Sequence, residues 1–203
     1  MKIILFCLCS FFGAIAVAQQ DISFKILDQT VSDKCLIKLK ISNNSRHAFF
    51  IPFDFTSASL DKDFFSPNPF FIDFVITNLK TKKRSRVELK CETDDCLKLS
   101  RKYYAAVCKK SVNDMLLLHP NESKIVNVYF QLQNKKNDFF YAEYENFLKY
   151  NNGEYTVMAT FVNNYDYCKC KLPRSVIVAL RRMGYHLYRK RITSNKVPLI
   201  IIN

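Results

Sequence analysis

The stretch KCLIKLKIS, residues 34–42, alternates between apolar and polar side chains. Its apolar members occupy every second position, while lysine and serine fill most positions between them: Cys35, Ile37, Leu39 and Ile41 against Lys38, Lys40 and Ser42. Successive side chains of a strand point to opposite faces of its sheet, so this period of two predicts a strand with one buried face.

Apolar, β-branched and aromatic segments of the same kind recur along the chain. They are ISFKI (22–26), HAFFIPFDF (47–55), FFIDFVITNL (70–79), VELK (87–90), SKIVNVYFQL (123–132), EYTVMATFV (154–162) and KVPLIII (196–202). Helical signals are few, and the sequence favours short helices only at 95–109 and 139–150. Strands joined by long irregular connections predict an antiparallel sandwich of two sheets rather than an α/β fold.

Three short motifs add to this expectation. They are the turn and strand LHPNES (118–123), the segment NNGEYTV (151–157) and the final strand ITSNKVPLIII (192–202). In the second motif, Gly153 precedes a strand that carries Tyr155, which is the placement of a tyrosine corner.

This order of motifs resembles immunoglobulin-like sandwich modules of exported bacterial proteins, and the segment AVAQQ (16–20) resembles the cleavage region of exported Bacteroidetes proteins. The resemblance covers residues 22–202. It implies an all-β, immunoglobulin-like, antiparallel two-sheet sandwich, in which residues 165–191 form a short basic helical insertion before the last strand. A fold of this kind implies no particular activity. The chain has no Trp, so the Cys–Trp–Cys core of antibody domains is absent.

The first residues have the composition of an export signal. Lys2 supplies a positive charge, residues 3–12 form an apolar run, and Ala16 and Ala18 stand at the small-residue positions before a cleavage site. The run is too short to span a bilayer, and no later stretch reaches about 18 uninterrupted apolar residues. We therefore expect a signal peptide at 1–18 and one domain at 19–203, periplasmic or secreted and not transmembrane after cleavage. A lipid anchor at Cys7 or Cys9 is the less favoured alternative, because bulky residues precede these cysteines.

Six cysteines remain in this expected mature chain. An even number in an exported protein indicates disulfides, and the candidates are Cys35, Cys91, Cys96, Cys108, Cys168 and Cys170. We expect Cys91 and Cys96 to pair across their polar turn, CETDDC. Cys168 and Cys170 are expected to tie the insertion to the sandwich; a soft-metal site or a redox pair is the alternative.

Several chemistries are excluded or disfavoured by residue content. After residue 18 the only glycines are Gly153 and Gly184, so neither a phosphate-binding loop nor a G-x-S-x-G motif is present. His47, His119 and His186 have no metal-binding spacing, so a histidine site would have to be assembled by the fold. Asp94 and Asp95 in CETDDC indicate a solvated turn rather than a Ca²⁺ loop. No catalytic residue, metal or cofactor is predicted.

The strongest concentration of charge lies near the C-terminus. The whole chain has 31 Lys and Arg against 18 Asp and Glu, a net charge of +13, and loss of residues 1–18 removes one Lys and no acid to leave +12. From residue 168 onward there are nine Lys or Arg and no acid. We expect a helix over 174–187, begun by Pro173, with the apolar stripe Val176, Leu180, Met183 and Leu187 packed on the sandwich. Two short strands are the alternative.

These observations favour an exported, non-enzymatic binding module. Its basic segment 169–196 suits an anionic envelope component such as a lipid headgroup, lipopolysaccharide or glycan, and a protein partner is the other option. The candidate contact residues are Arg174, Arg181, Arg182, Arg189, Lys190 and Arg191. The same arginines also suit an ordinary solvated surface. Nucleic acid is disfavoured by location.

Two other functions stay open. A protease-inhibitor-like sandwich would act through the long loops 55–69 and 91–114. An enzyme whose site is assembled by the fold is the third option.

Overall fold

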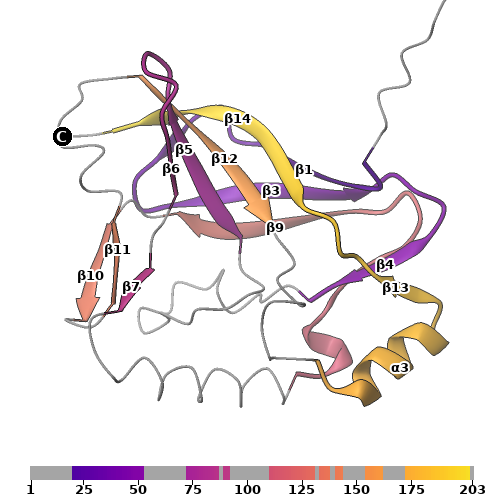
Figure 1. Ribbon diagram of the computed structural model, residues 1–203. Helices are drawn as coiled ribbons and strands as arrows, with labels where there is room; N and C mark the ends of the chain where they lie inside the picture. Colours follow the sequence, from indigo (N-terminus) through magenta and orange to yellow (C-terminus); the bar gives the residue numbers. More distant parts are fainter. Residues whose placement is uncertain are drawn as a thin grey trace, which may run out of the picture.

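The computed structural model describes residues 20–52, 72–86, 89–91, 110–130, 133–137, 140–143, 154–161 and 172–201 (Figure 1). Within these ranges the chain is mostly β-strand, with one α-helix and one short 3-10 helix. The segment that contains residues 1–18 lies outside them.

Two sheets form the body of the molecule. The first has the strand order β1 (Ile22–Ile26), β3 (Cys35–Asn43), β9 (Ser123–Phe130). The second has the order β2 (Val31–Ser32), β14 (Ile192–Ile200), β12 (Tyr155–Phe161), β5 (Asp73–Asn78), β6 (Arg84–Arg86). Neighbouring strands are antiparallel except β2, which runs parallel to β14. The chain therefore leaves the first sheet after β1 and joins the second at β2.

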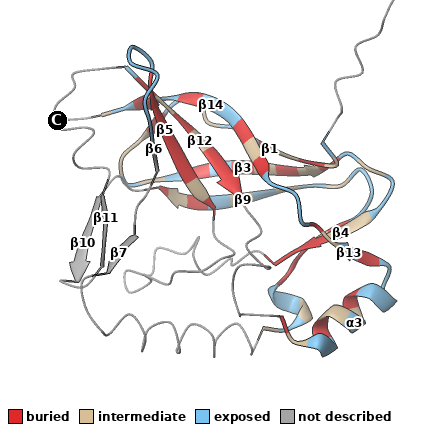
Figure 2. Ribbon diagram, viewed as in Figure 1, coloured by how far each residue is buried: buried red, intermediate tan, exposed pale blue. Residues whose placement is uncertain are grey.

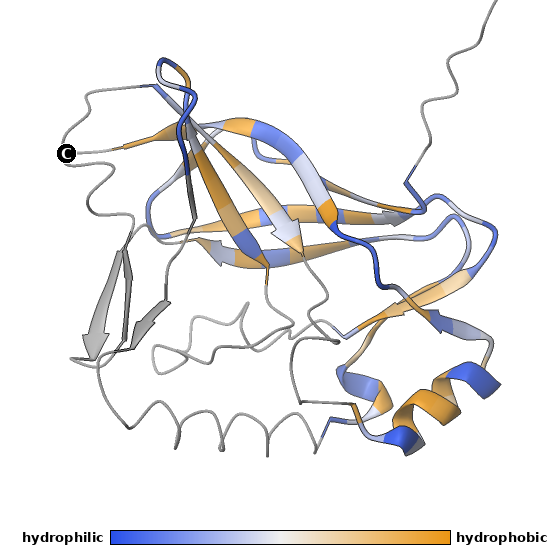
Figure 3. Ribbon diagram, in the orientation of Figure 1, coloured by the Kyte–Doolittle hydropathy of each residue, from blue (hydrophilic) through white to orange (hydrophobic). Residues whose placement is uncertain are grey.

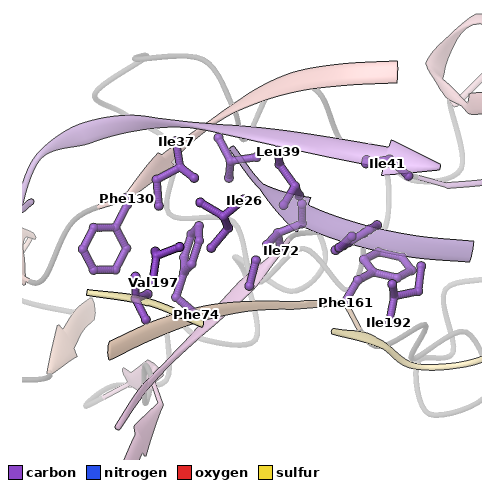
Figure 4. Close-up of a cluster of buried hydrophobic side chains, with 14 of the residues drawn as sticks. Ile26, Ile37, Leu39, Ile41, Ile72, Phe74, Phe130, Phe161, Ile192 and Val197 are labelled. Atoms are coloured by element: carbon purple, nitrogen blue, oxygen red, sulfur yellow. The ribbon is translucent and has the colours of Figure 1, made fainter. Parts of the chain in front are cut away.

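One hydrophobic core lies between these two sheets (Figures 2 and 4). From β3, Ile37, Leu39 and Ile41 point into it and are at most 1% exposed, so the predicted strand and its buried face are confirmed. Across the core, the rings of Phe74 on β5 and Phe130 on β9 meet edge to face with centroids 5.1 Å apart. Burial of apolar area stabilises such a core by about 25 cal/mol per Å².

A third, smaller sheet lies at one end of the molecule (Figure 1). Its strand order is β13 (Tyr185–Leu187), β4 (Ala48–Ile51), β8 (Leu116–Leu118), with β13 parallel to β4. The helix α3 (Arg174–Arg182) and the 3-10 helix η2 (Val112–Asp114) adjoin it. A second hydrophobic cluster joins them: Phe50, Met115, Leu172, Val176, Leu180 and Tyr185. The expected basic helix before the last strand is therefore present.

A fourth sheet has the order β10 (Gln133–Asn137), β11 (Phe140–Glu143), β7 (Leu89–Cys91). β11 occupies residues for which the sequence favoured a helix, so the expectation at 139–150 is wrong for these four residues. Residues 140–142 pair antiparallel with β7, and this long-range pairing outweighs the local preference. The other expected helix, 95–109, lies outside the described residues.

Candidate anion-binding surface

The helix α3 begins after Pro173 and ends one turn earlier than its apolar pattern predicts. The carbonyl of Pro173 accepts the N–H groups of Val176 and Ile177 at 3.0 and 3.2 Å. At the other end, Gly184 donates its N–H to the Arg181 carbonyl at 3.0 Å and has a φ of +85°. That left-handed conformation is easy for glycine and strained for other residues, so the helix stops at Arg182.

Because α3 ends at Arg182, only the first two residues of the expected apolar stripe lie on the helix. Val176 and Leu180 pack into the second hydrophobic cluster, and Leu180 is fully buried. Met183 follows the helix and is 57% exposed, and Leu187 is half-buried on β13. The prediction of one helix over 174–187 with four buried apolar residues is therefore wrong in its second half. The buried face contacts the cluster of the small sheet rather than the core of the two large sheets.

The outward face of α3 is cationic with an apolar centre. Arg174, Val178, Arg181 and Arg182 share this face because residues three and four apart lie together on a helix. All four are exposed, and the exposed Met183 follows Arg182. Figure 3 shows the hydrophilic ends of α3 on either side of its hydrophobic middle. Among the described residues, none of the three arginines forms an ion pair or a side-chain hydrogen bond.

The position of Arg174 is unfavourable for the helix itself. Cations stabilise the C-terminal turn, where Arg181 and Arg182 lie, and are disfavoured near the positive N-terminal end of the helix dipole, where Arg174 lies. No acidic residue lies in the first turn. Helix stability therefore does not account for Arg174.

The remaining three candidates lie between β13 and β14 and differ from the helix arginines. Lys190 donates to the Asp21 carboxylate at 2.8 Å, and this hydrogen bond raises the pKa of Lys190. Arg191 Nε donates to Thr160 Oγ1 at 3.2 Å. Arg189 is exposed. Lys190 and Arg191 thus have partners within the protein, which leaves the outward face of α3 as the better candidate for contact with an external anion.

A second basic surface lies on the turn between β5 and β6. Its residues are all exposed: Lys80, Lys82, Lys83 and Arg84. Asn78 Oδ1 accepts the N–H groups of Lys80 and Thr81 at 2.9 and 2.8 Å and so shapes the turn. In Figure 1 this hairpin lies at the opposite end of the molecule from α3.

The fold also brings histidines together that are far apart in the sequence. The rings of His47 and His186 lie 5.9 Å apart, and His119 Nε2 lies 2.9 Å from the hydroxyl of Tyr185. Burial raises the pKa of Tyr185, and the nearby carboxylate of Glu122 adds to the effect. In the described part of the chain, no three His, Cys, Asp or Glu side chains gather as a metal site.

The structure describes only part of the predicted disulfide candidates and long loops. Cys35, one of the six disulfide candidates, has a half-buried free thiol. The side chains of the other candidates, Cys91, Cys96, Cys108, Cys168 and Cys170, lie outside the described residues, as do Asp94 and Asp95. The same holds for loop 55–69 and for 92–109 of the second loop, on which a protease-inhibitor function would depend.

The described ranges contain no helix of the length and apolar character that a membrane span requires.

Comparison with known protein families and with curated proteins finds no match to this chain.

Proposed function

We propose that this chain is an exported, non-enzymatic, immunoglobulin-like binding module that contacts an anionic component of the cell envelope through the outward face of α3. The observation that carries the proposal is the set Arg174, Arg181 and Arg182, exposed around Val178 and Met183. In the ranges that the structure describes, no acid neutralises them.

The strand order supports an immunoglobulin-like topology. The order β1–β3–β9 matches strands A, B and E of that fold, and β14–β12–β5–β6 matches G, F, C and C′. Tyr155 stands at the first position of β12, the equivalent of strand F, and is 2% exposed. This is the place of the tyrosine corner in such domains.

The chemistry of this face suits phosphate and carboxylate groups. Guanidinium groups bind such anions with paired hydrogen bonds, and arginine keeps its charge at any physiological pH. Val178 and Met183 add apolar area beside the charges, a combination typical of helices that lie on an anionic membrane surface. Lipid headgroups, lipopolysaccharide and acidic glycans share the anionic chemistry.

Vesicle binding tests this proposal. We expect the protein to co-sediment with vesicles of phosphatidylcholine mixed with phosphatidylglycerol and to stay free of pure phosphatidylcholine, with binding that weakens as salt is added. Replacing Arg181 and Arg182 by Ser should weaken binding, whereas replacing Lys82 and Lys83 by Ser removes the same charge and should not. Parallel arms with lipopolysaccharide and with a uronate-rich glycan identify which anion is preferred.

Equal loss of binding in both double variants would show that binding depends on net charge alone and not on the position of the arginines on α3. No binding in any arm would contradict the proposed function.

Export has its own test. Expression with the native leader in a Gram-negative host, followed by intact-mass measurement of the periplasmic and secreted protein, should give an N-terminus at Gln19. A retained leader, or an added diacylglycerol, would contradict the assignment.

A further inference from the structure

Two exposed histidines meet at the edge of the small sheet, although one precedes β4 and the other lies on β13. The ring centroids of His47 and His186 are 5.9 Å apart, and the ring planes cross at 83°. The two strands run side by side and parallel, with His186 opposite Phe49 (Figure 1). Neither ring belongs to the anion-binding face of α3.

The backbone under each ring is fixed. The His47 carbonyl accepts hydrogen bonds from Asn43 Nδ2 at 2.7 Å and from Ser45 Oγ at 3.1 Å, and its N–H donates to Ser45 Oγ at 3.1 Å. Asn43 itself is 1% exposed. His186 is held by the pairing of β13 with β4. The His186 ring also contacts the ring of Phe49, with centroids 6.5 Å apart. Fixed backbones and ring contacts of this kind lower the cost of joint binding to one ligand, because fewer torsions remain to be ordered.

The separation of the rings suits a shared metal ion. A ring nitrogen bound at about 2.0–2.1 Å places the metal roughly 3.2 Å from the ring centre, so two rings on one metal lie about 4.5 to 6.4 Å apart as the nitrogen–metal–nitrogen angle opens from about 90° to 180°. The observed 5.9 Å falls in that range. Imidazole is a good ligand for late first-row divalent ions, and affinity rises along that row to Cu²⁺.

We propose that His47 and His186 together bind a late first-row divalent cation, with Cu²⁺ bound most tightly and water at the remaining positions. Bound metal would link the turn before β4 to β13 and so join two segments that are far apart in the sequence. His119 is not part of this site, because its ring is engaged by the hydroxyl of Tyr185.

Copper titration of the full chain tests the site. In the wild-type protein, electron paramagnetic resonance of bound Cu²⁺ should show coupling to two imidazole nitrogens. His47→Ala and His186→Ala should each remove one nitrogen and weaken binding by about tenfold or more, because the second ligand no longer acts at high effective concentration. His119→Ala is the matched control and should keep both nitrogens and the affinity.

Binding of Cu²⁺ should also raise the melting temperature of the wild-type protein and of His119→Ala, because only the folded state holds the rings of His47 and His186 close together. Free thiols such as that of Cys35 reduce Cu²⁺, so they are alkylated in every variant before the titration, and differences between the variants then report on the histidines. Unchanged affinity in either of the two site variants, or an equal loss in His119→Ala, would overturn the proposal.

Discussion

Asn195 of β14 hydrogen-bonds to both backbone groups of Ile26 on β1. Its Oδ1 accepts the Ile26 N–H at 2.8 Å, and its Nδ2 donates to the Ile26 carbonyl at 3.3 Å. β1 belongs to the first sheet and β14 to the second. The Asn195 side chain thus forms the two hydrogen bonds that a neighbouring strand would form with Ile26, and it links the two sheets at their edge.

A bulge in β14 lies at this link. The register with β12 shifts between Met158 and Thr160, where β14 has one extra residue. Such a bulge bends the strand and re-aims its side chains, here that of Asn195. Ser194 Oγ accepts the Ala159 N–H at 2.9 Å and so supplies a partner for that backbone group.

The first prediction concerns this link. Asn195→Ala should lower the free energy of unfolding by about 1–3 kcal/mol, because it leaves two partly buried backbone groups of Ile26 without partners. Urea denaturation measures the change. The control is Asn44→Ala, which removes exposed hydrogen bonds to Gln20 and Ser23 and should cost less than about 0.5 kcal/mol. Equal losses of unfolding free energy in the two variants would show that the Asn195 link contributes no more than exposed hydrogen bonds do.

The second prediction separates the two halves of the expected helix stripe. Leu180→Ala should destabilise the protein by about 2–5 kcal/mol, because it opens a cavity in the second cluster. Met183→Ala, at an exposed position just beyond α3, should change stability by less than about 0.5 kcal/mol. Thermal or urea denaturation of both variants measures these changes in stability. A larger effect at Met183 would mean that the helix buries its other face.

The strands were predictable because their signal is local. In the segment at 34–42 the period of two both identifies β3 and says which side chains face the core. The end of α3 was harder, since Met183 and Leu187 continue the apolar spacing past the point where the chain turns. Gly184 was the available signal, because glycine is favoured just beyond a helix C-terminus.

Other features depend on long-range pairing that no local pattern reveals. β13 has only three residues, and its parallel pairing with β4 brings together segments that are far apart in the sequence. The contact between the His47 and His186 rings follows from that pairing, so it could not be predicted from their sequence positions. The candidate cationic residues were identified from charge and helical spacing. Only the structure separates those on α3 from Lys190 and Arg191, which form hydrogen bonds within the protein.

The third prediction concerns two lysines that face each other on the first sheet. Lys25 on β1 is directly opposite Lys40 on β3. Like charges at such positions destabilise a sheet, and opposite charges contribute roughly 0.2–1 kcal/mol. Lys40→Glu should therefore stabilise the protein by an amount in that range, and the gain should shrink with added salt.

The control for Lys40 is its neighbour on the same face. Lys38 lies opposite Asn127 on β9, so Lys38→Glu makes the same change of net charge without a lysine directly opposite on that strand. Urea denaturation of both variants at low and high salt measures the difference. An equal gain at Lys38 would point to net charge rather than to the pairing of β1 with β3.

The last prediction is a dependence of stability on pH at the 3-10 helix beside α3. The backbone N–H and the hydroxyl of Ser111 both donate to Asp114 Oδ2, at 2.7 and 2.8 Å. These hydrogen bonds, the backbone one first, hold the pKa of Asp114 below its usual value of 3.8. A carboxyl whose pKa is lower in the folded state stabilises the fold above its unfolded pKa, and this contribution is lost as the pH falls through the folded value.

Asp114→Asn keeps an oxygen acceptor but has no charge to titrate. The variant should therefore be less stable than the wild-type protein at neutral pH, by a small amount because the carboxylate is exposed and screened. The gap should narrow as the pH falls below about 3.8, since the wild-type carboxylate then gains a proton and loses its advantage. Urea denaturation of both proteins across the acid range measures the gap, and a gap that widens toward low pH would contradict the role assigned to Ser111.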